Sequence, residues 1–245
     1  MSGRGAERIL DAVEWFATTT SPVSYTDFVH ALDVPKSSAL LLLRLLVSRG
    51  YVQRLPDNRY VLVRLPGEAL GGGNTWGTIL RLADGHLREA VATVEETGFV
   101  AVLDNERIRY LNKILPKREI RYDRDIVPTR LPHQVASGLV MLADFSPEEL
   151  DRYLEEAEVR ADERPGILTA IATARTDGCY VNLNGVVEGA AGIAAPVRDA
   201  QGHAIAAINI SGPRDRIIAN LDRIKDAVVS VAGAVSNEVA SRKRK

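Results

Sequence analysis

The sequence is poor in the residues on which metal, redox and disulfide chemistry depend. Cys179 is the single cysteine among 245 residues, which excludes a disulfide framework and a cysteine-rich zinc site. The four histidines are far apart in the sequence, and no His-x-x-x-His pair, Cys-x-x-Cys pair or Gly-x-Ser-x-Gly elbow is present. We therefore expect no catalytic residues, no metal site and no cofactor. A small-molecule enzyme is the less favoured alternative to a binding protein.

Long apolar runs and a strong net charge are also lacking. No run of hydrophobic residues approaches the roughly 20 that a membrane-spanning helix needs, and the first residues, Met-Ser-Gly-Arg-Gly, lack the apolar core of a signal peptide. We therefore expect a cytoplasmic protein with no membrane partner. Residues 1–66 hold eight Lys and Arg against six Asp and Glu, so their net charge of +2 leaves −3 for the rest of a total of −1. With so weak a positive excess, any nucleic-acid binding depends on local placement and on the pairing of two copies.

Residues 33–54 have the pattern of a helix that reads DNA. Pro35 suits the first helical turn, where its missing N–H has no cost, and Gly50 suits a left-handed C-terminal cap. Apolar residues recur at helical spacing and are predicted to face a core: Ala39, Leu42, Leu43 and Leu46. The outward positions begin with a basic, hydroxyl-bearing turn: Lys36, Ser37, Ser38, Leu40, Leu41 and Arg44. A helix of this kind is what a helix-turn-helix protein offers to the major groove.

Two further helices precede this one. Residues 6–17 are amphipathic, with a predicted inner face made of Ile9, Val13, Phe16 and Ala17. Ser24 and Asp27 have the spacing of a capping box for a second helix, Tyr25–Leu32. The three helices together predict a helix-turn-helix fold.

A predicted hairpin follows the third helix. Residues 51–63 are two short strands around a turn at 56–58, which makes the unit a winged helix-turn-helix. Arg54 and Arg59 lie on this wing and are expected to contact phosphates. Helix-turn-helix geometry also occurs in protein-docking modules, which is the alternative to DNA binding.

Three consecutive glycines at 71–73 indicate a connection between two domains. We predict a DNA-binding domain over residues 1–66, a glycine-rich linker over 67–75 and a second domain over 76–245. A nucleotide-binding glycine loop is disfavoured because the segment lacks the Lys-Ser/Thr ending of a P-loop and has no strand before it.

The second domain has the helix and strand pattern of an α+β sensor-like domain. A helix over Trp76–Thr97 is expected to end at Gly98 and to lead into a hairpin over 99–115. Further helices are predicted over 137–145, from Ser146 onward and over 166–176, the last ended by Gly178. Strands are predicted over 179–184, 191–197 and 203–211, followed by a final helix whose stripe is Ile217, Leu221, Ile224, Val228, Ala232, Val235 and Val239.

Three motifs now give the chain a resemblance to a known family. They are Pro35–Ser38 with Leu45–Val52, Leu131–Gly138, and Gly192–Gly202 running into Ala206–Pro213. In this order they resemble the IclR-type (isocitrate-lyase-regulator-like) bacterial transcription regulators over nearly the whole chain. The resemblance implies a winged-helix domain for double-stranded DNA, a linker helix and a GAF-like effector-binding domain. It further implies a regulator, of the repressor kind, that assembles as a homodimer or dimer of dimers on a pseudo-palindromic operator.

The recognition helix departs from the family pattern. Leu40 and Leu41 stand where family members place polar residues. Leucine makes no hydrogen bond to a base and offers only apolar contact, for instance with a thymine methyl group. The pair is therefore either part of the DNA surface or an interface patch. In the second case the protein is a ligand sensor that has lost sequence-specific DNA binding.

The effector domain departs from the family as well. The resemblance implies an effector pocket, and the positions predicted to form it are His133, Val135, Ala136, Ser137, Asn182, Gly192, Asn209 and Ser211. Asn182 replaces an acid and Gly192 a cysteine, whereas Asn209 and Ser211, two apart on a strand, point to the same face. With no buried arginine evident, we expect a small organic acid or a polar aromatic whose anionic group meets the helix start near Ser137. The alternative is that these polar groups only satisfy the backbone and that His133 packs.

Overall fold

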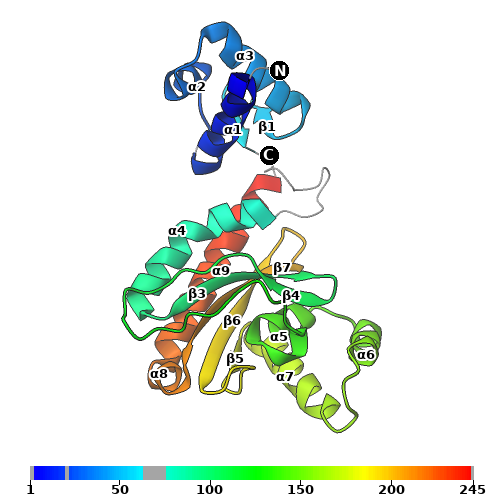
Figure 1. Ribbon diagram of the computed structural model, residues 1–245. Helices are drawn as coiled ribbons and strands as arrows, with labels where there is room; N and C mark the ends of the chain where they lie inside the picture. Colours follow the sequence, from blue (N-terminus) through cyan, green and yellow to red (C-terminus); the bar gives the residue numbers. More distant parts are fainter. Residues whose placement is uncertain (1–2, 20–21, 63–75, 244–245) are drawn as a thin grey trace. The chain divides into compact units, whose positions relative to one another are not determined.

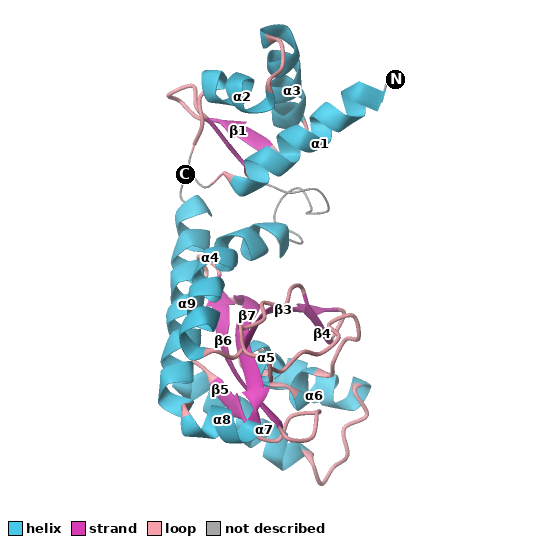
Figure 2. Cartoon of the chain, turned by 60° about the vertical axis from the view of Figure 1, so that its left-hand side comes forward, coloured by secondary structure: helices cyan, strands magenta, loops and turns pink. Residues whose placement is uncertain are grey.

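The computed structural model describes residues 3–19, 22–62 and 76–243, and the chain divides into two compact units, Met1–Arg81 and Leu82–Lys245 (Figures 1 and 2). The division falls within helix α4 (Trp76–Val94). The predicted linker at 67–75, with its three glycines, lies outside the described residues. The predicted boundaries of the two domains stay a prediction.

The first unit is a three-helix bundle with a two-stranded wing. Its elements are α1 (Gly3–Thr18), α2 (Tyr25–Leu32), α3 (Lys36–Ser48), β1 (Val52–Arg54) and β2 (Tyr60–Leu62). The capping box before α2 is present, since the Ser24 hydroxyl accepts from the Asp27 N–H and the Asp27 carboxylate accepts from the Ser24 N–H. Gly50 takes a left-handed conformation (φ 69°) after α3, as predicted.

The buried face of α1 differs from the predicted one. Ala12 and Phe16 are buried, whereas Ile9 is 37% exposed. Aromatic packing sets this orientation: Phe16 stacks on Phe28 with ring centroids 5.4 Å apart, and Trp15 meets both rings edge-on at 5.2 and 5.5 Å. The rings therefore turn the helix away from the simple periodic face.

The second unit is a five-stranded antiparallel sheet with helices on both faces (Figure 2). The strand order is β4-β3-β7-β6-β5, and the strands are β3 (Thr97–Asp104), β4 (Arg107–Tyr110), β5 (Tyr180–Asn182), β6 (Ala190–Arg198) and β7 (Ala204–Pro213). One face carries α4 and α9 (Leu221–Lys243). The other carries α5 (Ala136–Leu142), α6 (Pro147–Glu156) and α7 (Arg164–Asp177), with the 3-10 turn η1 (Pro132–Gln134) before α5.

The two sheet faces have different cores because side chains alternate along each strand. Ala194 and Ala207 pack under α5, whereas Ile193, Ile208 and Ile210 point to the opposite face and are fully buried. Asn209 shares the α5 side with Ala207. The α5 side of the sheet is thus the side on which the predicted pocket residues lie.

Two predicted helix ends are wrong. The first long helix ends at Val94, because Glu95 turns left-handed (φ 59°), and Gly98 lies within β3 opposite Ile210. A Cβ on Gly98 would lie 2.6 Å from Val91, so the close approach of α4 to the strand requires glycine there.

The prediction of one continuous final helix is also wrong, because the segment forms two helices, α8 and α9. α8 (Arg214–Ala219) ends at Asn220, whose side-chain amide donates to the carbonyl of Arg216. The predicted stripe is otherwise buried at Ile217, Ile224, Val228, Ala232 and Val235.

A buried ion pair holds α8 to the corner between α4 and β3. Glu96 is 2% exposed and accepts two hydrogen bonds from the Arg216 guanidinium, at 2.6 and 2.9 Å. Arg216 also donates to the carbonyl of Ile120. A Cβ on Gly212, near the end of β7, would lie 2.2 Å from the Glu96 carboxylate, so the ion pair requires glycine at this position. The pair ties three segments that are distant in sequence.

Candidate functional site

Helix α3 presents the side chains predicted to contact DNA. Its predicted inner face is confirmed, since Ala39, Leu42, Leu43 and Leu46 are all buried. Lys36, Ser37 and Arg44 are exposed and Ser38 is half-buried. The helix begins at Lys36, one residue later than predicted, with Pro35 as the N-cap residue. The Tyr25 hydroxyl donates to the Lys36 carbonyl at 2.6 Å and fixes this start against α2.

The two leucines of α3 lie on the same outer surface. Leu41 is 69% exposed and Leu40 is 37% exposed, and neither is part of the core of the first unit. An exposed leucine pair beside Lys36 and Arg44 is an apolar patch with a basic border. Such a surface suits a partner that offers both anionic groups and methyl groups.

The wing arginines are exposed, and both contact side chains of the wing turn. Arg54 donates to the Asn58 side chain at 2.6 Å, and Arg59 pairs with Asp57 at 2.7 Å. The Arg59 guanidinium keeps the pKa of Asp57 below its usual value. Asp57 therefore stays ionised and offsets part of the positive charge of the wing.

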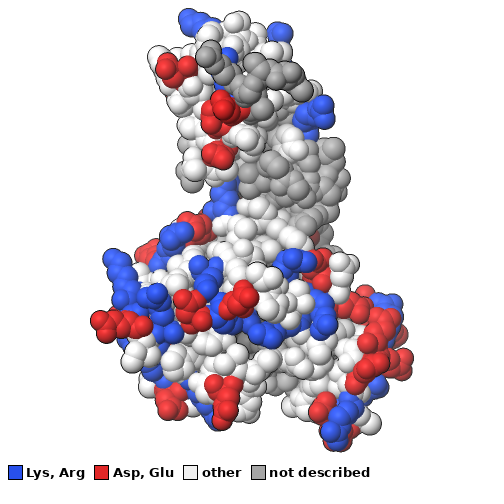
Figure 3. Space-filling model, viewed as in Figure 1, with Lys and Arg blue, Asp and Glu red and all other residues white. Residues whose placement is uncertain are grey.

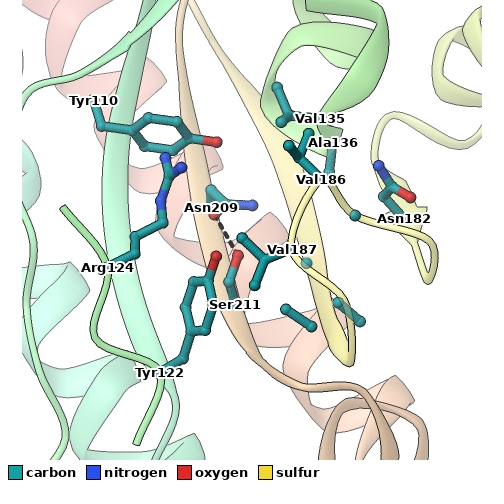
Figure 4. Close-up of a pocket in the computed structure, with 14 residues that line it drawn as sticks. Tyr110, Tyr122, Arg124, Val135, Ala136, Asn182, Val186, Val187, Asn209 and Ser211 are labelled. Carbon is teal, nitrogen blue, oxygen red and sulfur yellow. Dashed lines mark hydrogen bonds between the residues drawn. The ribbon is translucent and has the colours of Figure 1, made fainter. Parts of the chain in front are cut away.

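A cavity of about 40 Å³ lies on the α5 side of the sheet (Figure 4). Six of the eight predicted pocket residues line it: Val135, Ala136, Asn182, Gly192, Asn209 and Ser211. It is also lined by residues that were not predicted: Tyr110, Tyr122, Arg124, Gly185, Val186, Val187, Ala190 and Ala191. The cavity is thus built from the centre of the sheet, the start of α5 and the connection between β5 and β6.

The polar side chains on the sheet are hydrogen-bonded to protein. The Asn209 amide donates to the Ile193 carbonyl at 3.1 Å, and its oxygen accepts from the Ser211 hydroxyl at 2.8 Å. Gly192 faces this pair on the neighbouring strand, and a Cβ there would lie 2.7 Å from the Ser211 oxygen. Glycine at 192 therefore leaves room for the Asn209–Ser211 pair.

Asn182 joins two segments at the edge of the cavity. Its amide donates to the Gln134 carbonyl, and its oxygen accepts from the Asn184 N–H, both at 3.0 Å. It thereby holds the start of the β5–β6 connection against η1. Asn182 and Asn209 thus both bond to backbone groups in this structure, as the alternative without a ligand role predicts.

Ser137 and His133 do not line this cavity. Ser137 is fully buried, and its hydroxyl lies 3.0 Å from that of Tyr110. His133 lies in a neighbouring open hollow of about 420 Å³, where its Nδ1 is 2.8 Å from the Tyr153 hydroxyl. Burial lowers the pKa of His133 and raises the pKa of Tyr153 to about 12. The histidine is therefore neutral near pH 7 and holds η1 against α6.

The pocket has an arginine that the sequence did not make evident, the half-buried Arg124. The Arg124 guanidinium lies over the Tyr110 ring, with its central carbon 4.0 Å from the ring centroid, and 5.6 Å from that of Phe99. Its Nη2 is enclosed and has no hydrogen-bond partner among the described residues. Sequence reasoning missed Arg124 and Tyr122 because residues 112–130 have no helix or strand periodicity. Among the lining residues that were not predicted, Tyr110 carries a sequence signal, because Ile108 and Tyr110 alternate with exposed arginines along β4.

The second unit carries a concentration of acidic side chains on one helix. In the view of Figure 3, acidic side chains gather over α6, whose sequence Pro-Glu-Glu-Leu-Asp-Arg-Tyr-Leu-Glu-Glu carries five carboxylates.

The described part of the chain has no helix that is long and apolar enough to cross a membrane. It also has no cluster of three or more His, Cys, Asp or Glu side chains suited to a metal ion.

Two family models match the chain in the order of its two units. The model of the IclR helix-turn-helix domain matches residues 5–56, and that of the bacterial transcriptional regulator IclR C-terminal domain matches residues 77–237. Among curated proteins, the HTH-type transcriptional regulator XynR of Escherichia coli K12 is 27% identical over 226 residues, which cover 87% of this chain and 88% of XynR.

Solved structures share the fold along nearly the whole chain. A protein of Rhodococcus sp. RHA1 has a TM-score of 0.61 and 25% identity, with 98% of this chain and 99% of that chain covered. An IclR homolog from Microbacterium hydrocarbonoxydans, complexed with 4-hydroxybenzoate, has a TM-score of 0.60 and 20% identity, with coverages of 96% and 98%. The mixed helix-and-sheet fold with an N-terminal winged helix is therefore confirmed. Because the C-terminal model alone spans more than half of the residues, the chain belongs to the IclR family of bacterial transcriptional regulators.

Proposed function

We propose that the protein binds an operator through α3 and the wing, and that a small molecule in the cavity under α5 controls this binding. The observation that carries the proposal is the exposed basic surface of α3 in one unit together with a partly open cavity lined by polar and apolar residues in the other. The complex of the Microbacterium homolog with 4-hydroxybenzoate supports a small-molecule effector.

The DNA contacts are divided between bases and phosphates. Lys36, Ser37 and Arg44 enter the major groove from α3, and Arg54 and Arg59 contact phosphates from the wing. Arg44→Ala should weaken a cognate site by about 1–3 kcal/mol if Arg44 contacts a base. Arg54→Ala should weaken all sequences alike and reduce the slope of affinity against salt by about one.

Gel shifts with DNA from the protein's own promoter region test these contacts. Arg88→Ala is the matched control, because Arg88 is an exposed arginine of α4 paired with Asp84. Its gel shifts should equal those of the unsubstituted protein. Unchanged shifts for both Arg44→Ala and Arg54→Ala would remove α3 and the wing from the DNA interface.

Two copies are proposed to act together. The net charge of +2 over residues 1–66 is too small for tight binding by one copy, so we propose a dimer or dimer of dimers on a pseudo-palindromic operator. Sedimentation at micromolar concentration should therefore give an oligomer. A monomer with full operator affinity would contradict this assembly.

The exposure of Leu40 and Leu41 favours a second candidate, a sensor that no longer reads DNA sequence. Selection of operators from random DNA distinguishes the two functions, because only a DNA-reading protein enriches a sequence. In a selected operator, replacing thymine by deoxyuridine removes only the methyl group. If the leucines lie in the groove, this replacement weakens binding at one or two positions of each half-site. Failure to select any sequence would favour the sensor.

A further inference from the structure

We propose that Arg124 is the charge anchor of the cavity and that the ligand is a monocarboxylate with an apolar body. This inference deepens the proposed function, because it names the class of effector and rests on the cavity being the effector site. The carboxylate binds the Arg124 guanidinium, and the apolar body extends toward Val186.

The lining of the cavity carries one positive charge. Arg124 is the single ionised side chain among the residues that line the cavity, and no Asp or Glu is among them. Its Nη2 is enclosed without a hydrogen-bond partner in the described chain. A buried N–H of a guanidinium that lacks an acceptor is costly, and a carboxylate oxygen supplies one with opposite charge.

The position of Arg124 is fixed by aromatic rings. Its guanidinium lies over Tyr110, and Figure 4 shows it reaching from the Tyr122 segment toward Asn209. A guanidinium stacked on an aromatic face is held in place by that contact. Its N–H groups point outward in the plane of the guanidinium and can still donate hydrogen bonds to a ligand. The anchor is therefore preorganised before the ligand arrives.

The sheet side of the cavity does not compete for the charge. Asn209 and Ser211 are hydrogen-bonded to each other, and the Asn209 amide also donates to the backbone. These neutral groups remain able to contact a ligand, but they neither attract nor repel a net charge. The selection of an anion over its neutral analogue therefore falls to Arg124.

The size of the cavity determines the shape of the ligand. A volume of about 40 Å³ is far below the roughly 300–1,000 Å³ of pockets that enclose a whole drug-sized ligand, so the cavity holds the carboxylate group but not the ring. Val186 and Val187 close the cavity and are 48% and 39% exposed, between Gly185 and Gly189. A larger ligand has to displace this pair.

The neighbouring hollow receives the rest of the ligand. It shares Asn182, Gly185 and Val186 with the cavity, so the valine segment separates the two spaces. Its other walls combine the apolar Leu139, Ile167 and Ala170 with uncharged polar residues, and no Asp, Glu, Lys or Arg side chain is among them: His133, Gln134, Tyr180 and Asn184. An apolar body is accommodated there, whereas a second carboxylate would have no cation to pair with.

Calorimetry on the full chain tests the anchor with benzoate, its neutral analogue benzamide and the dicarboxylate terephthalate. Benzoate should bind at least tenfold more tightly than either of the other two. Arg124→Gln should lose about 10- to 100-fold in benzoate affinity, as expected for a hydrogen bond to a charged group, and change benzamide affinity by less than about threefold. Arg121→Gln, an exposed arginine of the same segment, is the control and should bind as the unsubstituted protein does.

The inference is overturned if benzamide binds as tightly as benzoate, if Arg124→Gln retains benzoate affinity, or if neither carboxylate binds. Should Arg124→Gln fail to fold, Arg124→Lys and the benzoate–benzamide ratio of the unsubstituted protein decide instead. Gel shifts with and without benzoate separate the two proposals. Arg124-dependent binding that leaves DNA affinity unchanged supports the anchor and contradicts effector control.

Discussion

Replacing Gly138 by alanine should disrupt the wall of the cavity through a backbone overlap. Gly138 lies in α5 directly over η1, and a Cβ there would lie 2.1 Å from the Pro132 carbonyl oxygen and 2.3 Å from its Cα. An ordinary van der Waals contact of a Cβ begins at about 3.4 Å, so η1 and α5 have to separate by more than about 1 Å. Because the obstacle is backbone, no rotamer change relieves it, and we expect a loss of at least about 3 kcal/mol.

Hydrogen exchange of β6 and β7 peptides is the suitable measurement, because a chain of two units does not unfold in one transition. The matched control is Gly233→Ala in α9, where an added Cβ meets nothing within 4 Å. It should stabilise the unit by about 0.5–1 kcal/mol. If Gly138→Ala costs less than about 1 kcal/mol, the overlap at Pro132 does not govern the packing of α5.

Two further perturbations concern the ion pair and the histidine. Glu96→Gln should lower the free energy of unfolding of the second unit by about 3 kcal/mol, because it leaves Arg216 without its buried partner. Hydrogen exchange of β3 and β7 peptides measures this loss, and in a double-mutant cycle with Arg216→Met the losses should not add. Burial lowers the pKa of His133 in the folded state, so the unfolded chain binds more protons below the ordinary value of 6.5. Stability should therefore fall as the pH drops below 6.5, and less so in His133→Gln; equal pH profiles for the two proteins would contradict this.

Local signals predicted the elements whose ends are set by their own residues. The capping boxes at Ser24 and Ser146 and the left-handed cap at Gly178 all lie where the sequence placed them. Gly98 misled the prediction of a helix end, because its glycine serves a close contact between α4 and β3. A glycine required by packing and a glycine required by a cap look alike in sequence.

The cavity was half predictable for a similar reason. The resemblance to the family singled out Asn209 and Ser211, and strand alternation then placed both side chains on one face of the sheet. Arg124 and Tyr122 reach the same cavity from an irregular segment, so no local periodicity marks them. Which loop covers which part of a sheet is decided by tertiary packing.

The burial of Cys179 makes the protein convenient for thiol labelling. The single thiol is 2% exposed, and burial raises its pKa, so it reacts slowly with maleimides or iodoacetamides at neutral pH. A second cysteine placed at Val187, which is 39% exposed beside the cavity, would carry a fluorophore without removal of the native one. The natural sequence is thus already suited to an optical sensor of whatever enters the cavity, including in screens of compound mixtures.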